Sequence, residues 1–151
     1  MKIIIGSDHR GVNLRKEIIK NLVEDGFEVV ETSIPNSDTD DYPDFAFDVG
    51  KKVLDGDNLG ILICGNGIGI SIAANKVKGI RCARVVNSDD VFKAKTHNGA
   101  NIIAIGADGH EIDEVMEMVN LFISTKPVSE TRHKKRVEKI IKYENGEYNE
   151  L

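Results

Sequence analysis

A cysteine followed by a glycine-rich segment is the strongest chemical signal in the sequence. Cys64 ends an apolar run, Ile61-Leu62-Ile63, and the next residues read Gly65-Asn66-Gly67-Ile68-Gly69. Glycines at this spacing allow backbone N–H groups to surround an anion at the start of a helix. The helix N-terminus also favours the thiolate of Cys64, which makes this side chain a candidate base or nucleophile.

The glycine spacing by itself leaves other interpretations open. A tight strand-to-helix turn needs glycine only for its backbone angles. The dinucleotide-binding fingerprint, Gly-x-Gly-x-x-Gly, is matched only at its first two glycines, Gly65 and Gly67. Ile70 occupies the position of the third glycine. A nicotinamide enzyme also needs an acidic residue to hold a ribose; Glu31 could serve, but the glycines follow the third predicted strand rather than the first. No Gly-Lys-Ser/Thr follows, so a P-loop is excluded.

Two histidine-bearing segments are further candidates. Ser7-Asp8-His9-Arg10-Gly11 follows the first apolar run, and His97-Asn98 ends a later predicted helix. Imidazoles titrate near neutral pH and can transfer protons. Ligand sites of open parallel sheets lie beyond the carboxyl ends of the strands, so we expect both segments to approach Cys64. No histidine pair has the i, i+4 spacing of a helical zinc site, and we expect no metal.

A basic run near the C-terminus is a candidate phosphate site. Arg132 and Arg136 are four residues apart in Arg132-His133-Lys134-Lys135-Arg136, which places two guanidinium groups on one face of a predicted helix. Paired guanidiniums bind phosphate well. The alternative is a solvated helix face, since Glu130 and Glu138 lie nearby.

Apolar runs alternate with helix-period segments along the chain, which is typical of βαβ units. We predict strands over residues 3–5, 27–30, 61–63, 81–86 and 102–105, and a last helix over about 130–143. Another helix begins near Tyr42-Pro43-Asp44. The predicted fold is a single α/β domain over residues 1–151, a Rossmann-like three-layer α/β/α sandwich with a five-stranded parallel sheet.

Composition restricts the function classes. The 151 residues carry 20 basic and 25 acidic side chains, a net charge of −5, and 40% of them are hydrophobic. This balance argues against general binding to nucleic acid or to an anionic membrane. The apolar runs are far shorter than a membrane span. Two cysteines are too few for a disulfide framework, so we expect a cytoplasmic protein with reduced thiols, Cys82 being buried in a strand.

Taken together, these motifs resemble the type B ribose-5-phosphate isomerase family, which includes the galactose-6-phosphate isomerase subunits. The resemblance covers nearly the whole chain. It is carried by Gly6-Ser7-Asp8-His9, Asp41-Tyr42-Pro43, Ile63-Cys64-Gly65, Gly69-Ile70-Ser71-Ile72-Ala73-Ala74-Asn75-Lys76, Gly79-Ile80-Arg81, His97-Asn98 and Arg132-His133 with Arg136.

The resemblance implies interconversion of D-ribose 5-phosphate and D-ribulose 5-phosphate through an enediolate, without metal or organic cofactor. It implies that Cys64 moves the proton between C2 and C1, with Asn66 beside the reacting atoms, and that His97 helps to open the sugar ring. Backbone amides of residues 65–69 would stabilise the oxyanion. The implied substrate-binding residues are Asp8, His9, Tyr42, Gly65, Gly67, Ile68, Gly69, Ser71, Asn98, Arg132 and Arg136. Of these, Asp8 and Asn98 would hold hydroxyls, and His9, Arg132 and Arg136 would hold the phosphate.

The family also implies a homodimer or tetramer whose active sites combine residues of two subunits, with the last helix packing on or across the dimer. Three positions depart from its pattern: Asn66 replaces a threonine, Gly99 a common aspartate, and Asp108 an arginine that is expected to reach the phosphate from the neighbouring subunit. Two alternatives therefore stay open, an isomerase of a hexose 6-phosphate and a non-catalytic sugar-phosphate or nucleotide-binding module.

Overall fold

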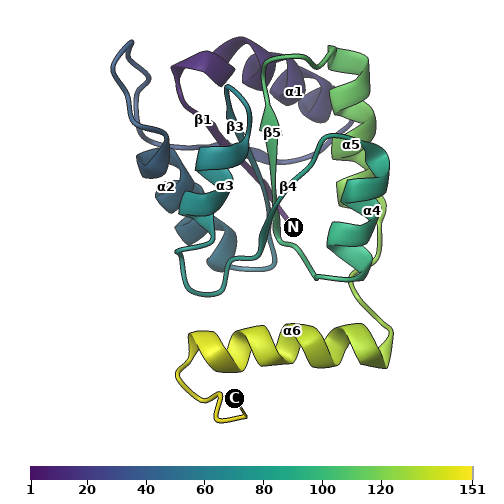
Figure 1. Cartoon of the computed structure of the whole chain (residues 1–151). Coiled ribbons are helices and arrows are strands. Elements are labelled where there is room, and N and C mark those ends of the chain that lie inside the picture. The colour runs from purple at the N-terminus through teal and green to yellow at the C-terminus, as the bar shows by residue number, and fades with distance from the viewer. Residues whose placement is uncertain (151) are drawn as a thin grey trace.

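The computed structural model describes residues 1–150 as a parallel β-sheet between two layers of helices (Figure 1). This is the predicted three-layer α/β/α sandwich. Its strands are β1 (Ile3–Ser7), β2 (Val29–Glu31), β3 (Leu59–Cys64), β4 (Cys82–Arg84) and β5 (Ile102–Gly106). A short 3₁₀ turn, η1 (His9–Gly11), follows β1 directly.

The helices divide between the two faces of the sheet. They are α1 (Val12–Glu24), α2 (Tyr42–Leu54), α3 (Ile68–Ala74), α4 (Ser88–Thr96), α5 (Ile112–Ser124) and α6 (Thr131–Glu144). One apolar cluster joins the sheet to α1, α4 and α5, and a second joins it to α2 and α3. The central strands are buried on both faces, which explains why their sequences are continuous Ile-rich runs without polar alternation.

The strands lie in the order β2-β1-β3-β5-β4. Their register pairs Ser7 with Ile63, and Cys64 with Gly106, at the carboxyl edge of the sheet. The residues that follow β1, β3 and β5 are therefore neighbours in space. Polar side chains after these three strands share one edge of the molecule.

All five strands differ from their predicted bounds: β1, β3 and β5 extend by one to three residues, β2 is shifted and β4 is shorter. Strand β2 begins at Val29, two residues later than the predicted 27–30, because the Phe27 N–H donates to Leu22 O in the turn that ends α1. Strand β4 is shorter than the predicted 81–86, and Arg81 instead donates its backbone N–H to the Asn101 side chain. None of these differences changes the order of elements.

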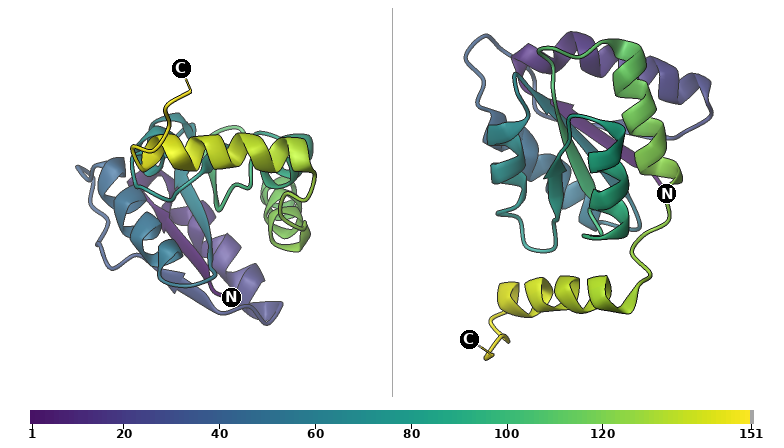
Figure 2. Two further views of the ribbon diagram at one scale, coloured as in Figure 1. Left: turned by 90° about the horizontal axis from the view of Figure 1, so that it is seen from below. Right: turned by 45° about the vertical axis from the view of Figure 1, so that its right-hand side comes forward.

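Helix α6 lies apart from the two helical layers, across the end of the sheet opposite the Cys64 edge (Figure 2, left). Its His133 ring stacks on His97, with the ring centroids 4.1 Å apart. Near its other end, Glu144 accepts a 2.9 Å hydrogen bond from the Gly79 N–H. Over residues 1–150, no helix is both long and apolar enough to cross a membrane.

Candidate active site

Cys64 lies at the base of a pocket of about 300 Å³ at the carboxyl edge of the sheet. Its thiol is buried, and its Sγ accepts a 3.2 Å hydrogen bond from the backbone N–H of Gly67. This hydrogen bond holds the sulfur against the glycine loop that begins α3. The pocket is lined by Asp8, Arg10, Tyr42, Cys64, Gly65, Asn66, Ile68 and Gly69.

The glycine loop is shaped by its backbone. Gly67 has φ +78°, which favours glycine, and a Cβ there would lie 3.1 Å from the backbone N of Gly106. Asn66 accepts the Ile68 N–H at 2.9 Å through its side-chain oxygen, and its own carbonyl accepts from Arg84 Nε. Asn66 therefore fixes the loop as well as lining the pocket.

Two of the loop amides are thus already engaged, Gly67 with the sulfur and Ile68 with Asn66. The next N–H of this first helical turn, that of Gly69, has no acceptor among residues 1–150. A Cβ at Gly69 would lie only 2.7 Å from Cζ of Tyr42, so glycine lets the Tyr42 ring approach the amide closely. The Gly69 amide is the clearest candidate donor to a ligand oxygen.

The segment after β1 forms the opposite wall of the pocket. The Asp8 carboxylate caps η1 by accepting a 3.0 Å hydrogen bond from the Arg10 N–H. Burial raises the pKa of Asp8, and this hydrogen bond opposes the rise. One oxygen of the Asp8 carboxyl group accepts this hydrogen bond, and the group as a whole lines the pocket. Its remaining acceptor capacity suits a sugar hydroxyl.

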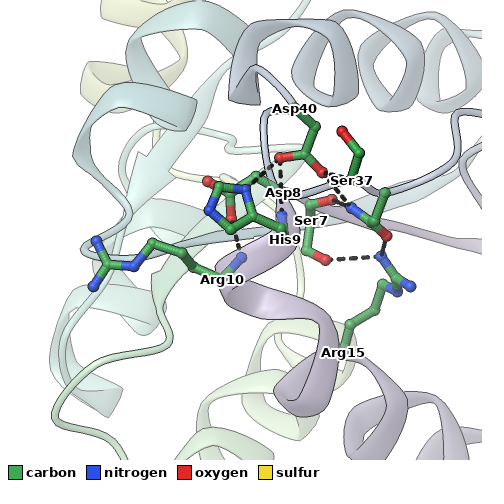
Figure 3. Close-up of polar contacts among 8 residues, drawn as sticks. Ser7, Asp8, His9, Arg10, Arg15, Ser37 and Asp40 are labelled. Carbon is green, nitrogen blue, oxygen red and sulfur yellow. Dashed lines mark hydrogen bonds and ion pairs between the residues drawn. The ribbon is translucent and has the colours of Figure 1, made fainter.

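His9 is held by a carboxylate that the sequence analysis missed. Asp40 Oδ1 accepts the His9 backbone N–H at 3.0 Å and lies 2.6 Å from His9 Nδ1, while its Oδ2 accepts from Asn36 and Ser37 (Figure 3). The hydrogen bond to Asp40 raises the pKa of His9. Burial opposes ionisation of Asp40, but its hydrogen bonds outweigh that effect and lower its pKa to about 2. His9 is thereby favoured as a cation, with its Nε2 free of the Asp40 contact.

Asp8, His9 and Asp40 each offer a ligand atom within 4.8 Å of the others, which is the spacing of a metal site. His9 Nδ1 and Asp40 Oδ1 are, however, engaged with each other. The geometry is therefore accounted for by the imidazole–carboxylate pair, and the expectation of no metal stays a prediction.

Arg10 is a second residue that the sequence analysis left out of the site. Its side chain extends away from the His9–Asp40 pair (Figure 3), lines the pocket and forms an ion pair with Asp108. Asp108 is anchored beside the loop because its N–H donates to Gly65 O at 3.0 Å. The expectation that position 108 reaches the site from a neighbouring subunit is wrong, because Asp108 lies beside the pocket of its own chain.

His97 and Asn98 do not approach Cys64 within one chain, contrary to our expectation that the three segments meet. They follow the C-terminus of α4 and precede the amino end of β5, whereas Cys64 pairs with Gly106 at the carboxyl end of β5. The four steps along β5 separate the two edges by roughly 13 Å.

The basic candidates of α6 share the His97 edge. Arg132 and Arg136 line a shallow surface hollow with Lys135 and Lys139, separate from the Cys64 pocket. Burial lowers the pKa of the adjacent His133, and the neighbouring His97 lowers it further. The chain therefore carries two groups of candidate residues at opposite edges: a thiol with a glycine loop, and, at the amino edge, an imidazole with a cationic helix face.

The remaining predicted residues are placed as follows. Ser71 does not line the pocket; its hydroxyl donates to Ile68 O at 2.7 Å. Cys82 lies in β4 as a free thiol, but it is only partly buried rather than buried as expected, because β4 is an edge strand. Burial still raises the pKa of its thiol to about 12, which fits the inert role expected of it. A larger hollow of about 550 Å³ at the amino edge, around Arg81 and Lys95, contains none of the predicted site residues.

Of the two residues missed, Arg10 was detectable from the sequence and Asp40 was not. Arg10 stands in the segment already singled out after the first strand, so its position was a signal. Asp40 lies in an acidic loop, 31 residues from His9, and no local pattern connects the two. Their roles depend on which loops the fold brings together.

Residues 3–140 match the family described as Ribose/Galactose Isomerase. A Bacillus subtilis protein named "Putative sugar phosphate isomerase YwlF" is 43% identical over 149 residues, covering 95% of this chain and 97% of its own length. Ribose-5-phosphate isomerase B of Mycolicibacterium paratuberculosis is 36% identical over 146 residues, covering 95% of this chain and 92% of its own length.

Solved structures agree with these sequence matches. Clostridium thermocellum ribose-5-phosphate isomerase B superposes with a TM-score of 0.91 at 42% identity, covering 97% of this chain and 99% of that one. The Mycoplasma genitalium ribose-5-phosphate isomerase B structure, which has ribulose-5-phosphate bound, gives a TM-score of 0.89 at 39% identity and covers 95% and 96% of the two chains.

Proposed function

The chain belongs to the ribose/galactose isomerase family, and we propose from this membership and from the Cys64 pocket that it interconverts D-ribose 5-phosphate and D-ribulose 5-phosphate. It is an aldose–ketose isomerase, and its substrate is a phosphorylated sugar. The observation that supports this most directly is the buried Cys64 sulfur, held by an amide and facing a pocket beside the free Gly69 N–H.

The proposed mechanism uses the groups that line this pocket. The Cys64 thiolate removes the proton from C2 of the open-chain aldose, and the electrons of that C–H bond form the C1–C2 double bond of an enediolate. The aldehyde oxygen thereby becomes an oxyanion, which the Gly69 N–H stabilises; a lost oxyanion donor typically costs about 2.7–4 kcal/mol. The proton of the O2 hydroxyl passes to O1, and protonation of C1 by the Cys64 thiol then completes the ketose and restores the thiolate. The Asp8 carboxyl group holds a sugar hydroxyl.

We propose that a homodimer completes the site. Ring opening by His97, hydroxyl binding by Asn98 and phosphate binding by Arg132 and Arg136 all require the amino-edge group of one copy to face the Cys64 pocket of another. This supports a two-fold arrangement, in which one pair of contacts builds two sites.

Exposed apolar side chains support the same proposal. Ile68, at the rim of the pocket, is 46% exposed, and Ile72 on the same helix is 57% exposed. Phe92 on α4 and Ile140 on α6 are about half exposed. A second copy would cover apolar surface that adjoins the pocket itself, with α6 packing on or across the dimer.

The test is an assay of purified protein with ribose 5-phosphate, with ketose formation followed in the presence of a chelator and without added cofactor. Solvent deuterium should enter the sugar at the transferred position, because the proton passes through an enzyme group. A panel containing galactose and allose 6-phosphates decides between pentose and hexose. Tight binding of ribose 5-phosphate without ketose formation would replace the isomerase by a binding module. The expected cytoplasmic location stays a prediction.

A further inference from the structure

Arg10 is the one cationic side chain that lines the Cys64 pocket among residues 1–150. The other guanidiniums expected to bind phosphate, Arg132 and Arg136, lie in a separate hollow on α6. The lining of the pocket therefore offers a sugar phosphate one positive charge from the chain whose thiol it reacts with, and His9 of the same chain lies outside that lining. This charge has no role in the mechanism above.

The placement of Arg10 is fixed from two sides. Its guanidinium lies directly over the α-carbon of Gly65, where an added Cβ would collide with it. Asp108 pairs with it, and Asp108 is itself tied to the glycine loop through the Gly65 carbonyl. The guanidinium is thus held against the loop that carries the reacting thiol.

The Arg10–Asp108 pair is nevertheless open to exchange. The two side chains are 54% and 63% exposed, and ion pairs exposed to this extent contribute little to stability. A guanidinium binds a phosphate through two parallel N–H···O bonds and carries donors beyond those that one carboxylate oxygen uses. The phosphate dianion also carries more charge than the carboxylate.

We propose that Arg10 is a phosphate-binding residue of this pocket and that Asp108 is a positioning residue, a carboxylate that holds the guanidinium until substrate phosphate displaces it. This deepens the proposed function and rests on it for the identity of the substrate. It also changes the significance of Asp108: the carboxylate is neutralised by Arg10 in the free enzyme and competes with the phosphate only for that guanidinium.

The experiment is calorimetric titration of the full-length protein with inorganic phosphate, which needs no turnover. Arg10→Met keeps an unbranched aliphatic side chain of similar reach and removes the guanidinium over Gly65, and should weaken phosphate binding by about 10-fold or more. Asp108→Asn releases Arg10 and should tighten binding a few-fold. Lys16→Met removes an exposed charge of α1 and is the matched control, with unchanged affinity expected.

The outcomes separate this inference from the proposed function. Unchanged phosphate affinity in Arg10→Met overturns it, even if the wild-type protein isomerises ribose 5-phosphate. Equal weakening by Arg10→Met and Asp108→Asn also overturns it, because the pair would then act only by holding the loop. If Arg10→Met does not fold, Asp108→Asn decides: unchanged or weaker binding refutes the role of Arg10. In steady-state assays, Arg10→Met should raise KM for ribose 5-phosphate more than it lowers kcat, with Arg10→Lys giving partial recovery.

Discussion

Mixing two inactive variants of this chain measures whether its active site is shared between copies. Cys64→Ala removes the proposed base at the carboxyl edge of the sheet, and His97→Ala removes the proposed ring-opening group at the amino edge. The edges are roughly 13 Å apart, so the two side chains of one copy do not act on the same sugar. Each variant should be nearly inactive alone.

The expected recovery follows from two-fold symmetry. If the chains pair at random, about half of the dimers are heterodimers, and each contains one site with both residues intact and one with neither, so the mixture should regain about a quarter of wild-type activity. The assay is ketose formation from ribose 5-phosphate after the chains are mixed, unfolded and refolded together. Native mass measurement of differently tagged chains verifies the heterodimers.

A chain carrying both substitutions provides the control. Mixed with equal wild-type chain, it should leave about a quarter of full activity if sites are shared, because heterodimers then contain no intact site, but about half if each site lies within one copy. Verified heterodimers with no recovered activity in the first mixture, together with half activity in the second, would refute the shared site.

Three further perturbations have definite expected results. Cys64→Ala should abolish turnover while leaving ribose 5-phosphate binding by calorimetry largely intact, whereas Cys82→Ala should be nearly silent, because burial raises the pKa of that thiol to about 12; full kcat in the first variant contradicts the base assignment. The hydrogen bond to Asp40 raises the pKa of His9, so Asp40→Asn should lower that pKa, and KM for the sugar phosphate should begin to increase at a lower pH than in the wild-type protein. Identical KM–pH profiles would show that His9 does not bind phosphate. Arg136→Ala should raise KM for the phosphorylated sugar by about tenfold, the effect of losing one charge-assisted hydrogen bond. An unchanged KM would show that this face of α6 is solvated surface and does not bind phosphate.

The fold was predictable because each element carries its own periodicity. Continuous Ile-rich runs mark strands buried on both faces, and the four-residue spacing of apolar side chains marks the helices that cover them. The order of the strands was not predictable in this way. That β5 lies between β3 and β4 depends on pairing between segments far apart in the chain, which no local period records.

The candidate site divides along the same line. Cys64 and its glycines were found because they are consecutive, so residue types and spacing alone indicate a strand end, a turn and a helix N-terminus. The contacts that tune the site are long-range: Asp40 meets His9 across 31 residues, and Asp108 meets Arg10 across 98. Carboxylates of this kind can be identified as site residues only from the three-dimensional arrangement of the loops.

His97 lies at the edge of the sheet opposite Cys64, and this position follows from the geometry of a parallel sheet. A crossover helix begins near the carboxyl end of one strand and must return the chain to the amino edge before the next parallel strand starts. The nine residues of α4, at 1.5 Å each, span roughly 13 Å, which matches the length of β5. A residue that ends such a helix therefore lies at the edge opposite the ligand site of its own sheet. A histidine there can reach a thiol at a strand's carboxyl end only in another copy of the chain. The His97–Asn98 motif, placed at the end of a crossover helix, thus favours a shared site on topology alone.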